Sequence, residues 1–261
     1  MLSKRLRTKR DDFCKDRLIS GSYSQIEPKK DSLMMKAVRP YIDLFFPPVC
    51  TCCGAAIKHE ARHLCSWCKK QRFSGIEMQE DQILPDVVQF QYSMWSFDKG
   101  GYLQQLLHGL KYNYLRKAGV ELGETLAGAF LQKVEHDITD TFEQFPPIIV
   151  PVPLHKSKFR KRGYNQAAAL AEGFGAVSGW EIVELSVVVR GKKTSTQTGL
   201  SSEKRIENVK NAFQILKPQK VFNRTPIIVD DVFTTGATTF ELAQVLSEYS
   251  EPAMIVTVAR A

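Results

Sequence analysis

Two adjacent acids, Asp230 and Asp231, end an apolar run in the stretch PIIVDDVFTTGATTFELAQVL, residues 226–246. The apolar run predicts a buried strand, and the residues after the turn repeat with helical spacing. In a parallel α/β sheet, ligands bind beyond the carboxyl ends of the strands, where helix N-termini present free N–H groups to anions. The turn can therefore hold a phosphate, while the two carboxylates suit hydroxyl groups or a hydrated Mg²⁺.

The turn between the acids and the helix consists of small residues. Gly236 allows the backbone to approach a ligand closely, and Thr234, Thr235 and Thr238 add hydroxyl donors. A sugar phosphate has both the hydroxyls and the phosphate that this layout would bind. The alternative is an aspartate that caps an ordinary helix, which would explain one acid and one threonine but not both acids and the whole turn.

Four of the six cysteines form two C-x-x-C pairs, Cys50/Cys53 and Cys65/Cys68, with eleven residues between the pairs. Each pair makes a tight turn, so the two pairs can supply four sulfurs to a tetrahedral Zn²⁺. Four thiolates leave no open coordination position, so the metal would be structural. The alternative is four unrelated buried thiols.

Three other residues could take part in this module. Cys52 lies inside the first pair, and the sequence CTCC leaves the choice of ligand open, although we expect Cys52 to be a spectator. His59 and His63 could replace a thiolate, but lone histidines in loops are more often solvated. Because the chain shows no secretion signal, disulfide bonds are not expected.

The chain is basic, with a formal net charge of +8 at pH 7. This balance suits nucleotides, sugar phosphates or nucleic acid as partners, although a basic surface without a specific role is the alternative. The cations gather in HKSKFRKR at 155–162 and RGKK at 190–193. No apolar run reaches the roughly 18 residues of a membrane span, and no apolar core follows the basic N-terminus. We therefore expect a cytoplasmic protein without membrane insertion.

Three segments are expected along the chain. Residues 1–35 are polar and basic and predict a flexible extension, and translation could also start at Met34 or Met35. Residues 36–75 predict a short helix followed by a zinc-ribbon module. Residues 76–261 alternate between strand and helix patterns, which predicts an α/β domain with a parallel sheet flanked by helices. Strands are expected at 87–97, 148–154, 181–189, 226–233 and 253–260, and helices at 36–47, 101–113, 121–134, 165–177 and 238–249.

The stretch IIVDDVFTTGAT resembles the signature with which type I phosphoribosyltransferases bind 5-phosphoribosyl 1-pyrophosphate (PRPP). The stretches VPVPLHKSKFRKRGYNQAAALA (150–171) and TSTQTGLSSEKRIENVKNAF (194–213), together with the cysteine pairs, are similar to the ComF family. That family includes the competence protein ComFC and the GntX-like proteins. The resemblance runs from about residue 40 to the C-terminus and implies a type I phosphoribosyltransferase-like sheet with a small N-terminal zinc ribbon.

The resemblance also implies roles for individual residues. The acid pair would bind the ribose hydroxyls of PRPP, and the turn after it would cradle the 5-phosphate. The basic run would form a pyrophosphate loop, and residues 191–212 would form a mobile loop that closes over the site. The implied residues are Asp230, Asp231, Thr234, Thr235, Gly236, Ala237 and Thr238 for PRPP; Lys156, Lys158, Arg160, Arg162 and Gly163 for pyrophosphate; and Gln197, Arg205 and Asn208 in the mobile loop.

The function that the resemblance implies is PRPP binding in a protein of DNA uptake and natural transformation. Mg²⁺-PRPP would be a glycosyl donor for an acceptor that the sequence does not name, and whether turnover occurs stays open. The alternative is a non-catalytic factor that binds single-stranded DNA beside other competence proteins. Aromatic residues available for such a groove are Trp67, Tyr92, Trp95 and Tyr112. A nucleobase-salvage phosphoribosyltransferase is a third reading, which the zinc ribbon disfavours.

Overall fold

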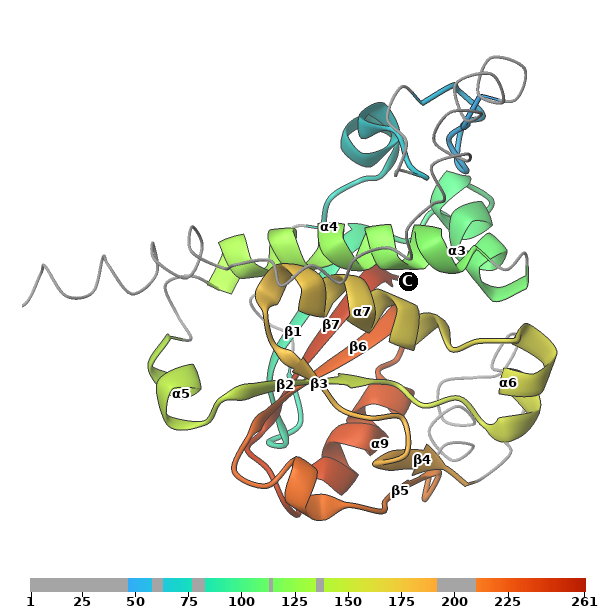
Figure 1. Ribbon diagram of the computed structural model, residues 1–261. Helices are drawn as coiled ribbons and strands as arrows, with labels where there is room; N and C mark the ends of the chain where they lie inside the picture. The colour runs from blue at the N-terminus through green and yellow to red at the C-terminus, as the bar shows by residue number, and fades with distance from the viewer. Residues whose placement is uncertain (1–46, 58–62, 77–82, 113–114, 135–138, 192–209) are drawn as a thin grey trace, which may run out of the picture. The chain divides into compact units, whose positions relative to one another are not determined.

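The computed structural model describes residues 47–57, 63–76, 83–112, 115–134, 139–191 and 210–261 (Figure 1). Both the cysteine module and the sheet belong to one compact unit, Pro48–Ala261. The predicted extension over 1–35, nearly all of the helix expected at 36–47, and His59, Gln197, Arg205 and Asn208 lie outside the described residues.

Five strands form a sheet in the order β1-β7-β6-β2-β3, and every neighbouring pair is parallel. Strands buried on both faces read as continuous apolar runs, and this is the pattern that predicted them. The predicted α/β fold with a parallel sheet is thereby confirmed. The strands are β1 (Val88–Ser96), β2 (Pro147–Pro151), β3 (Glu181–Ile182), β6 (Thr225–Phe233) and β7 (Ala253–Arg260).

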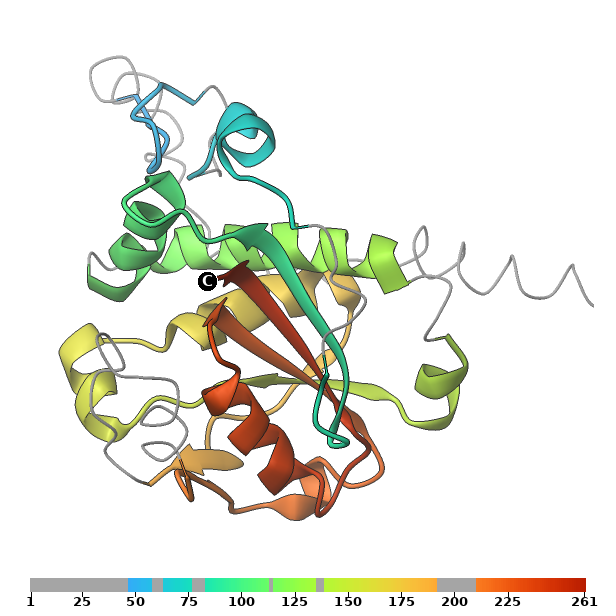
Figure 2. The same cartoon turned by 180° about the vertical axis from the view of Figure 1, so that it is seen from behind.

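Helices cover both faces of the sheet, as Figure 1 and the reverse view in Figure 2 show. The first face carries α3, α4 and α7, and the second carries α9 and a two-stranded antiparallel hairpin, β4-β5. No helix among the described residues is long and apolar enough to cross a membrane. The bounds are α3 (Tyr102–Tyr112), α4 (Arg116–Val134), α5 (Thr139–Gln144), α6 (Lys156–Arg162), α7 (Gln166–Ser178), α9 (Ala237–Leu246), β4 (Val188–Arg190), β5 (Phe213–Ile215), a π-helical turn at Cys68–Arg72 and a 3₁₀ turn at Pro218–Lys220.

The central strands alternate their side chains between two buried cores. In β6, Ile227 and Val229 pack with α4 and α7, while Ile228 packs with α9. Since the period of a strand is two residues, Asp231 continues the row of Ile227 and Val229, and Asp230 continues the row of Ile228. The two adjacent acids therefore leave β6 on opposite faces of the sheet.

Three local predictions differ from the structure. The single strand expected at 181–189 is two strands, because a turn closed by Val187 N–H and Glu184 C=O (2.9 Å) interrupts it. The helix expected at 121–134 begins earlier, at Arg116. The basic run expected as a loop forms the short helix α6, because His155 caps its first turn and Gly163 ends it with a left-handed backbone, φ 76°.

Candidate functional site

The acid pair lies where the sheet changes its direction of winding. From β2 the chain goes on to β3 on one side, and from β6 it goes on to β7 on the other. β6 pairs with β2 only as far as Val229, but it pairs with β7 as far as Phe233. Asp230 and Asp231 therefore occupy the part of β6 that has lost its neighbour β2. A crevice at such a switch point is the general location of ligand sites in open α/β sheets.

The two carboxyl groups have different environments. Asp231 is only 8 % exposed, and its Oδ2 lies 2.5 Å from Nζ of Lys111, at the end of α3. Burial alone would raise the pKa of Asp231, but Lys111 holds it below its ordinary value. Burial and the neighbouring charge of Asp231 raise the pKa of Asp230 to about 7. Near neutral pH, Asp231 is thus ionised while Asp230 titrates.

The turn after the acids leads directly into α9. Gly236 precedes the helix with a left-handed φ of 75°, and a Cβ there would lie 2.3 Å from the ring of Phe240. Only glycine fits both the dihedral angle and this close approach. Gly236, the N-cap residue, has no side chain to cap the helix, and Oγ1 of Thr235 accepts from the N–H of Ala237 over 3.4 Å. The N–H groups and the dipole of a helix N-terminus give this end of α9 the character of an anion site.

Cations from α3, α6 and β4 lie close enough to interact with the acid pair or with one another. Lys158 of α6 is half-buried, and burial followed by the charges of Arg190, Arg162 and Lys111 lowers its pKa. Arg162 is close enough to Asp231 to lower that carboxyl's pKa. Positive charges outnumber negative ones in this group, so the crevice is suited to an anionic ligand.

Sequence reasoning did not assign two of these cations. Lys111 lies near the end of a predicted helix, and its contact with Asp231 appears only in the fold. Arg190, at the end of β4, is 8 % exposed and lies 5.2 Å above the ring of Phe213. Burial lowers its pKa, and Asp230 acts in the opposite direction. The signals in the sequence were the cationic run RGKK, which begins at Arg190, and the apolar run VVV directly before it.

The four predicted cysteines come together in space. Cys50 Sγ lies 3.9 Å from Cys68 Sγ, and Cys53 Sγ lies 3.8 Å from Cys65 Sγ. All four sulfurs lie within 4.8 Å of one another. A Zn–S bond of about 2.3 Å makes the edge of a tetrahedron about 3.8 Å, so the sulfur positions fit a zinc ion.

Backbone donors support the same cluster. Cys65 N–H donates to Cys50 Sγ, and Cys68 N–H donates to Cys65 Sγ, each over 3.3 Å. Such N–H···S bonds stabilise thiolates, which are the form that binds metal. Cys52 is half-buried and is not one of the four clustered sulfurs. These cysteines are consistent with a structural zinc ribbon.

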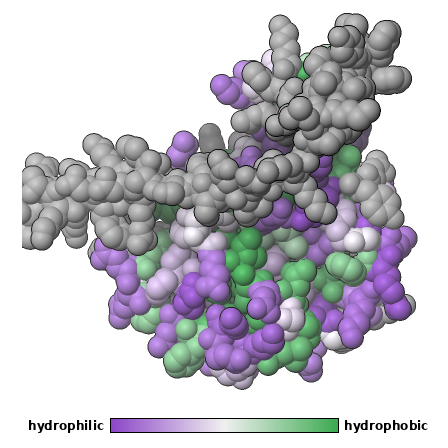
Figure 3. Space-filling view, viewed as in Figure 1, coloured by the Kyte–Doolittle hydropathy of each residue, from purple (hydrophilic) through white to green (hydrophobic). Residues whose placement is uncertain are grey.

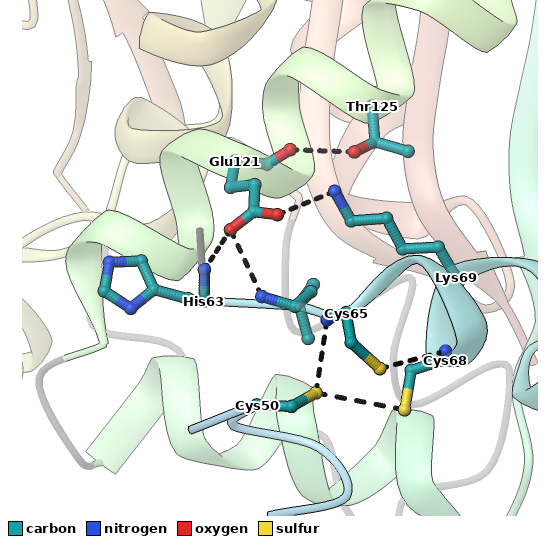
Figure 4. A network of polar contacts seen from close by, with 8 residues as sticks. Cys50, His63, Cys65, Cys68, Lys69, Glu121 and Thr125 are labelled. Atoms are coloured by element: carbon teal, nitrogen blue, oxygen red, sulfur yellow. Dashed lines mark hydrogen bonds and ion pairs between the residues drawn. The ribbon is translucent and has the colours of Figure 1, made fainter. Parts of the chain in front are cut away.

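One buried carboxylate joins the cysteine module to the sheet domain (Figure 4). Glu121 of α4 accepts hydrogen bonds from the backbone N–H groups of His63 and Leu64. Its other oxygen lies 2.7 Å from Nζ of Lys69. A carboxylate that is 5 % exposed is stable there only because these partners replace its hydration. Glu121 thereby holds the second cysteine knuckle against α4.

The aromatic residues considered for a nucleic-acid groove differ in how exposed they are. Trp95 is buried against Phe73, and Tyr92 packs on Phe130. Trp95 is therefore closed to a base, while Tyr92 is half-buried. Trp67 and Tyr112 are exposed, at 54 % and 44 %.

The fold and the site define a class: an α/β protein with an acid pair at the switch point of a parallel sheet and a four-cysteine cluster before it. Competence protein F of Haemophilus influenzae is 32 % identical over 209 residues, which are 76 % of this chain and 78 % of that protein. The chain belongs to the ComF family. No protein-family model matches it.

Two further relatives share shorter regions. DNA utilization protein YhgH of Escherichia coli is 38 % identical over 146 residues, 55 % of this chain and 60 % of that protein. Competence protein ComFC of Bacillus subtilis is 31 % identical over 123 residues, 46 % of this chain and 48 % of that protein. The predicted resemblance to the ComF family is therefore confirmed.

Proposed function

We propose that the crevice at the carboxyl ends of β2 and β6 binds Mg²⁺-PRPP. The observation that carries the proposal is the meeting of Asp230 and Asp231 with the N-terminus of α9 and with several cations. A phosphorylated sugar offers hydroxyls to carboxylates and phosphates to N–H groups and cations, so its chemistry matches each part of the crevice.

Each part of the ligand has a proposed partner. Asp230 and Asp231 would hold the ribose hydroxyls, with Mg²⁺ bound alongside PRPP. The turn Thr234–Thr238 would receive the 5-phosphate. Lys158, Arg162 and Arg190 would face the pyrophosphate, because their charges already act on the acid pair or on one another. Gln197, Arg205 and Asn208 remain predictions for a loop that closes over the ligand.

The proposed chemistry is transfer of the phosphoribosyl group with departure of pyrophosphate. The cations would neutralise the leaving group, and no nucleophilic side chain would be needed. Release of pyrophosphate from PRPP by the purified chain, screened against nitrogen acceptors, tests turnover separately from binding.

The biological setting that we propose is the handling of DNA. Its support is family membership, since the relatives' names state competence and DNA utilization. A deletion strain that takes up and uses DNA as well as its parent would count against this role.

Calorimetric titration with Mg²⁺-PRPP tests the site. We expect binding at one site per chain, and at least about tenfold weaker binding by Asp230→Asn/Asp231→Asn, because charged hydrogen bonds contribute about 1.5–3 kcal/mol each. The control variant Asp86→Asn removes an exposed acid before β1 and should bind as the wild type does. Unchanged binding by the double variant would refute the assignment.

A second candidate function, binding of single-stranded DNA, is favoured by one surface feature. The guanidinium carbon of Arg72 lies 4.7 Å from the ring centre of Trp67 and 3.8 Å from that of Tyr102. Both rings are partly exposed, so bases could stack beside them. Trp67→Ala/Tyr102→Ala should weaken binding of a labelled oligothymidylate about tenfold or more, at about 1–3 kcal/mol per stacked base. Phe222→Ala, which removes an exposed ring elsewhere, is the matched control.

A further inference from the structure

A cavity of about 510 Å³ opens between α6 and β4, and its wall includes Arg190, whose charge interacts with Asp230. Its volume lies within the range of about 300–1,000 Å³ that holds small ligands. Most of its wall is apolar, and its polar groups are cationic or amide groups. The lining residues are Pro153, Leu154, Lys156, Phe159, Arg160, Asn165, Leu185, Val188, Val189 and Arg190.

The cations of helix α6 fall into two pairs, one that lines the cavity and one whose charges act near the acid pair. Lys156 and Arg160 are four residues apart, so they lie on one face of the helix, and both line the cavity. Lys158 and Arg162 are also four residues apart, and their charges act in the crevice of the acid pair. The basic run, which looks continuous in the sequence, therefore places cations both in the cavity and near the acid pair, and Arg190 of β4 belongs to both groups.

The charged residues that the structure describes in the cavity wall all have the same sign. No acidic residue is among those that line it, and Lys156 and Arg160 have no ion pair with any residue that the structure describes. In the space-filling view of Figure 3, the edge of the molecule where α6 lies is mostly hydrophilic. Unpaired cations beside a low-dielectric wall attract anions strongly.

The apolar part of the wall indicates what the anion is attached to. Phe159 is 43 % exposed, and Leu185 opposite it is 50 % exposed, although both line the cavity. Asn165 is already used, because its side chain donates to Val152 C=O and accepts from Ala167 N–H. A flat aromatic ring with a phosphate at one end would cover the exposed ring and pair the cations.

We propose that this cavity is a second site, which binds a nucleoside monophosphate with its phosphate between Lys156 and Arg160 and its base against Phe159. This inference goes beyond PRPP binding and does not depend on it. Because the two sites share α6, a nucleotide in the cavity is placed to influence the crevice without occupying it.

Calorimetric titration of the full chain with AMP, alone and with saturating Mg²⁺-PRPP, tests the proposal. We expect about one AMP per chain under both conditions, and at least tenfold weaker AMP binding by Lys156→Ala/Arg160→Ala. Lys161→Ala removes a cation of the same helix that does not line the cavity, and should bind AMP within about twofold of the wild type.

Two further variants test which part of the ligand each residue contacts and whether the cavity and the PRPP site act independently. Phe159→Ala should weaken AMP severalfold and leave inorganic phosphate and Mg²⁺-PRPP unaffected, since the ring would contact only the base. Lys158→Ala should weaken Mg²⁺-PRPP and leave AMP unaffected. Absence of AMP binding, displacement of AMP by PRPP, or inorganic phosphate binding as tightly as AMP would each overturn the proposal. Failure of PRPP to bind would refute the proposed function only, because the titration with AMP alone would still report on the cavity.

Discussion

Lys111 Nζ lies 2.5 Å from Asp231 Oδ2, and this contact joins α3 to the end of β6. Burial would lower the pKa of Lys111, but Asp231 raises it, and Lys111 in turn lowers the pKa of Asp231. The ion pair keeps Asp231 charged where burial would otherwise favour its protonation.

Replacing Lys111 with Met should destabilise the chain by about 1–3 kcal/mol, because it leaves a buried carboxylate without its partner while the lysine side chain is partly exposed. Adding Asp231→Asn should recover most of this loss. Urea unfolding of the single and double variants measures the coupling. Lys117→Met, at an exposed position of α4, is the control, and equal losses in both lysine variants would contradict the prediction.

The raised pKa of Asp230 predicts a specific dependence of stability on pH. Its pKa in the fold is about 7, above the ordinary value of 3.8, so the folded state binds this proton more tightly. Its contribution is therefore complete below about pH 4 and is lost as the pH rises through 7. Relative to Asp230→Asn, the wild-type free energy of unfolding should fall by about 2–4 kcal/mol between pH 4 and pH 8. Parallel stability profiles for the two proteins would show that Asp230 has an ordinary pKa.

The cysteine cluster predicts about one zinc per chain and a module that depends on it. Cys65→Ser should lose most of the metal, because three thiolates bind it less tightly than four. Cys52→Ser, a change directly beside the clustered Cys53, should keep it. Metal analysis gives the zinc content, and limited proteolysis between Cys50 and Phe73 reports the loss of structure. Full zinc content in Cys65→Ser would mean that another residue serves as a ligand.

Glu121→Gln should destabilise the chain by about 1–3 kcal/mol, since it removes the charge that Lys69 and two backbone N–H groups bind. Zinc content should not change, because Glu121 does not belong to the sulfur cluster. Glu124→Gln, at an exposed position of the same helix, should have little effect on thermal unfolding. A loss of zinc in Glu121→Gln would indicate that the knuckle does not form without α4.

Helices α4 and α7 approach each other closely at two glycines. A Cβ at Gly173 would lie 1.9 Å from Val120 O, and one at Gly123 would lie 2.0 Å from Leu170 O. Gly173→Ala should therefore cost roughly 3 kcal/mol or more, because backbone must move apart. Gly128→Ala, also in α4, meets no atom within 4 Å and should stabilise the chain by up to about 1 kcal/mol. Similar denaturation midpoints for the two variants would refute the close approach.

Local patterns in the sequence were sufficient for much of this protein. The apolar runs of β2, β6 and β7 predict buried parallel strands, because both faces of such strands need apolar residues. The C-x-x-C spacing predicts the sulfur cluster, since each tight turn sets the distance between its own two thiols. The acids at the end of β6 could be located for the same reason, as the strand itself positions them.

Tertiary structure alone decided which side chains meet across the fold. Helix α6 has no buried residue, so the sequence shows no apolar period for it, and only the fold brings its cations to the cavity beside β4 and to the acid pair. The partners Lys111 of Asp231 and Lys69 of Glu121 come from distant segments. Such pairs depend on how helices pack on a sheet, and local propensity carries no information about that packing.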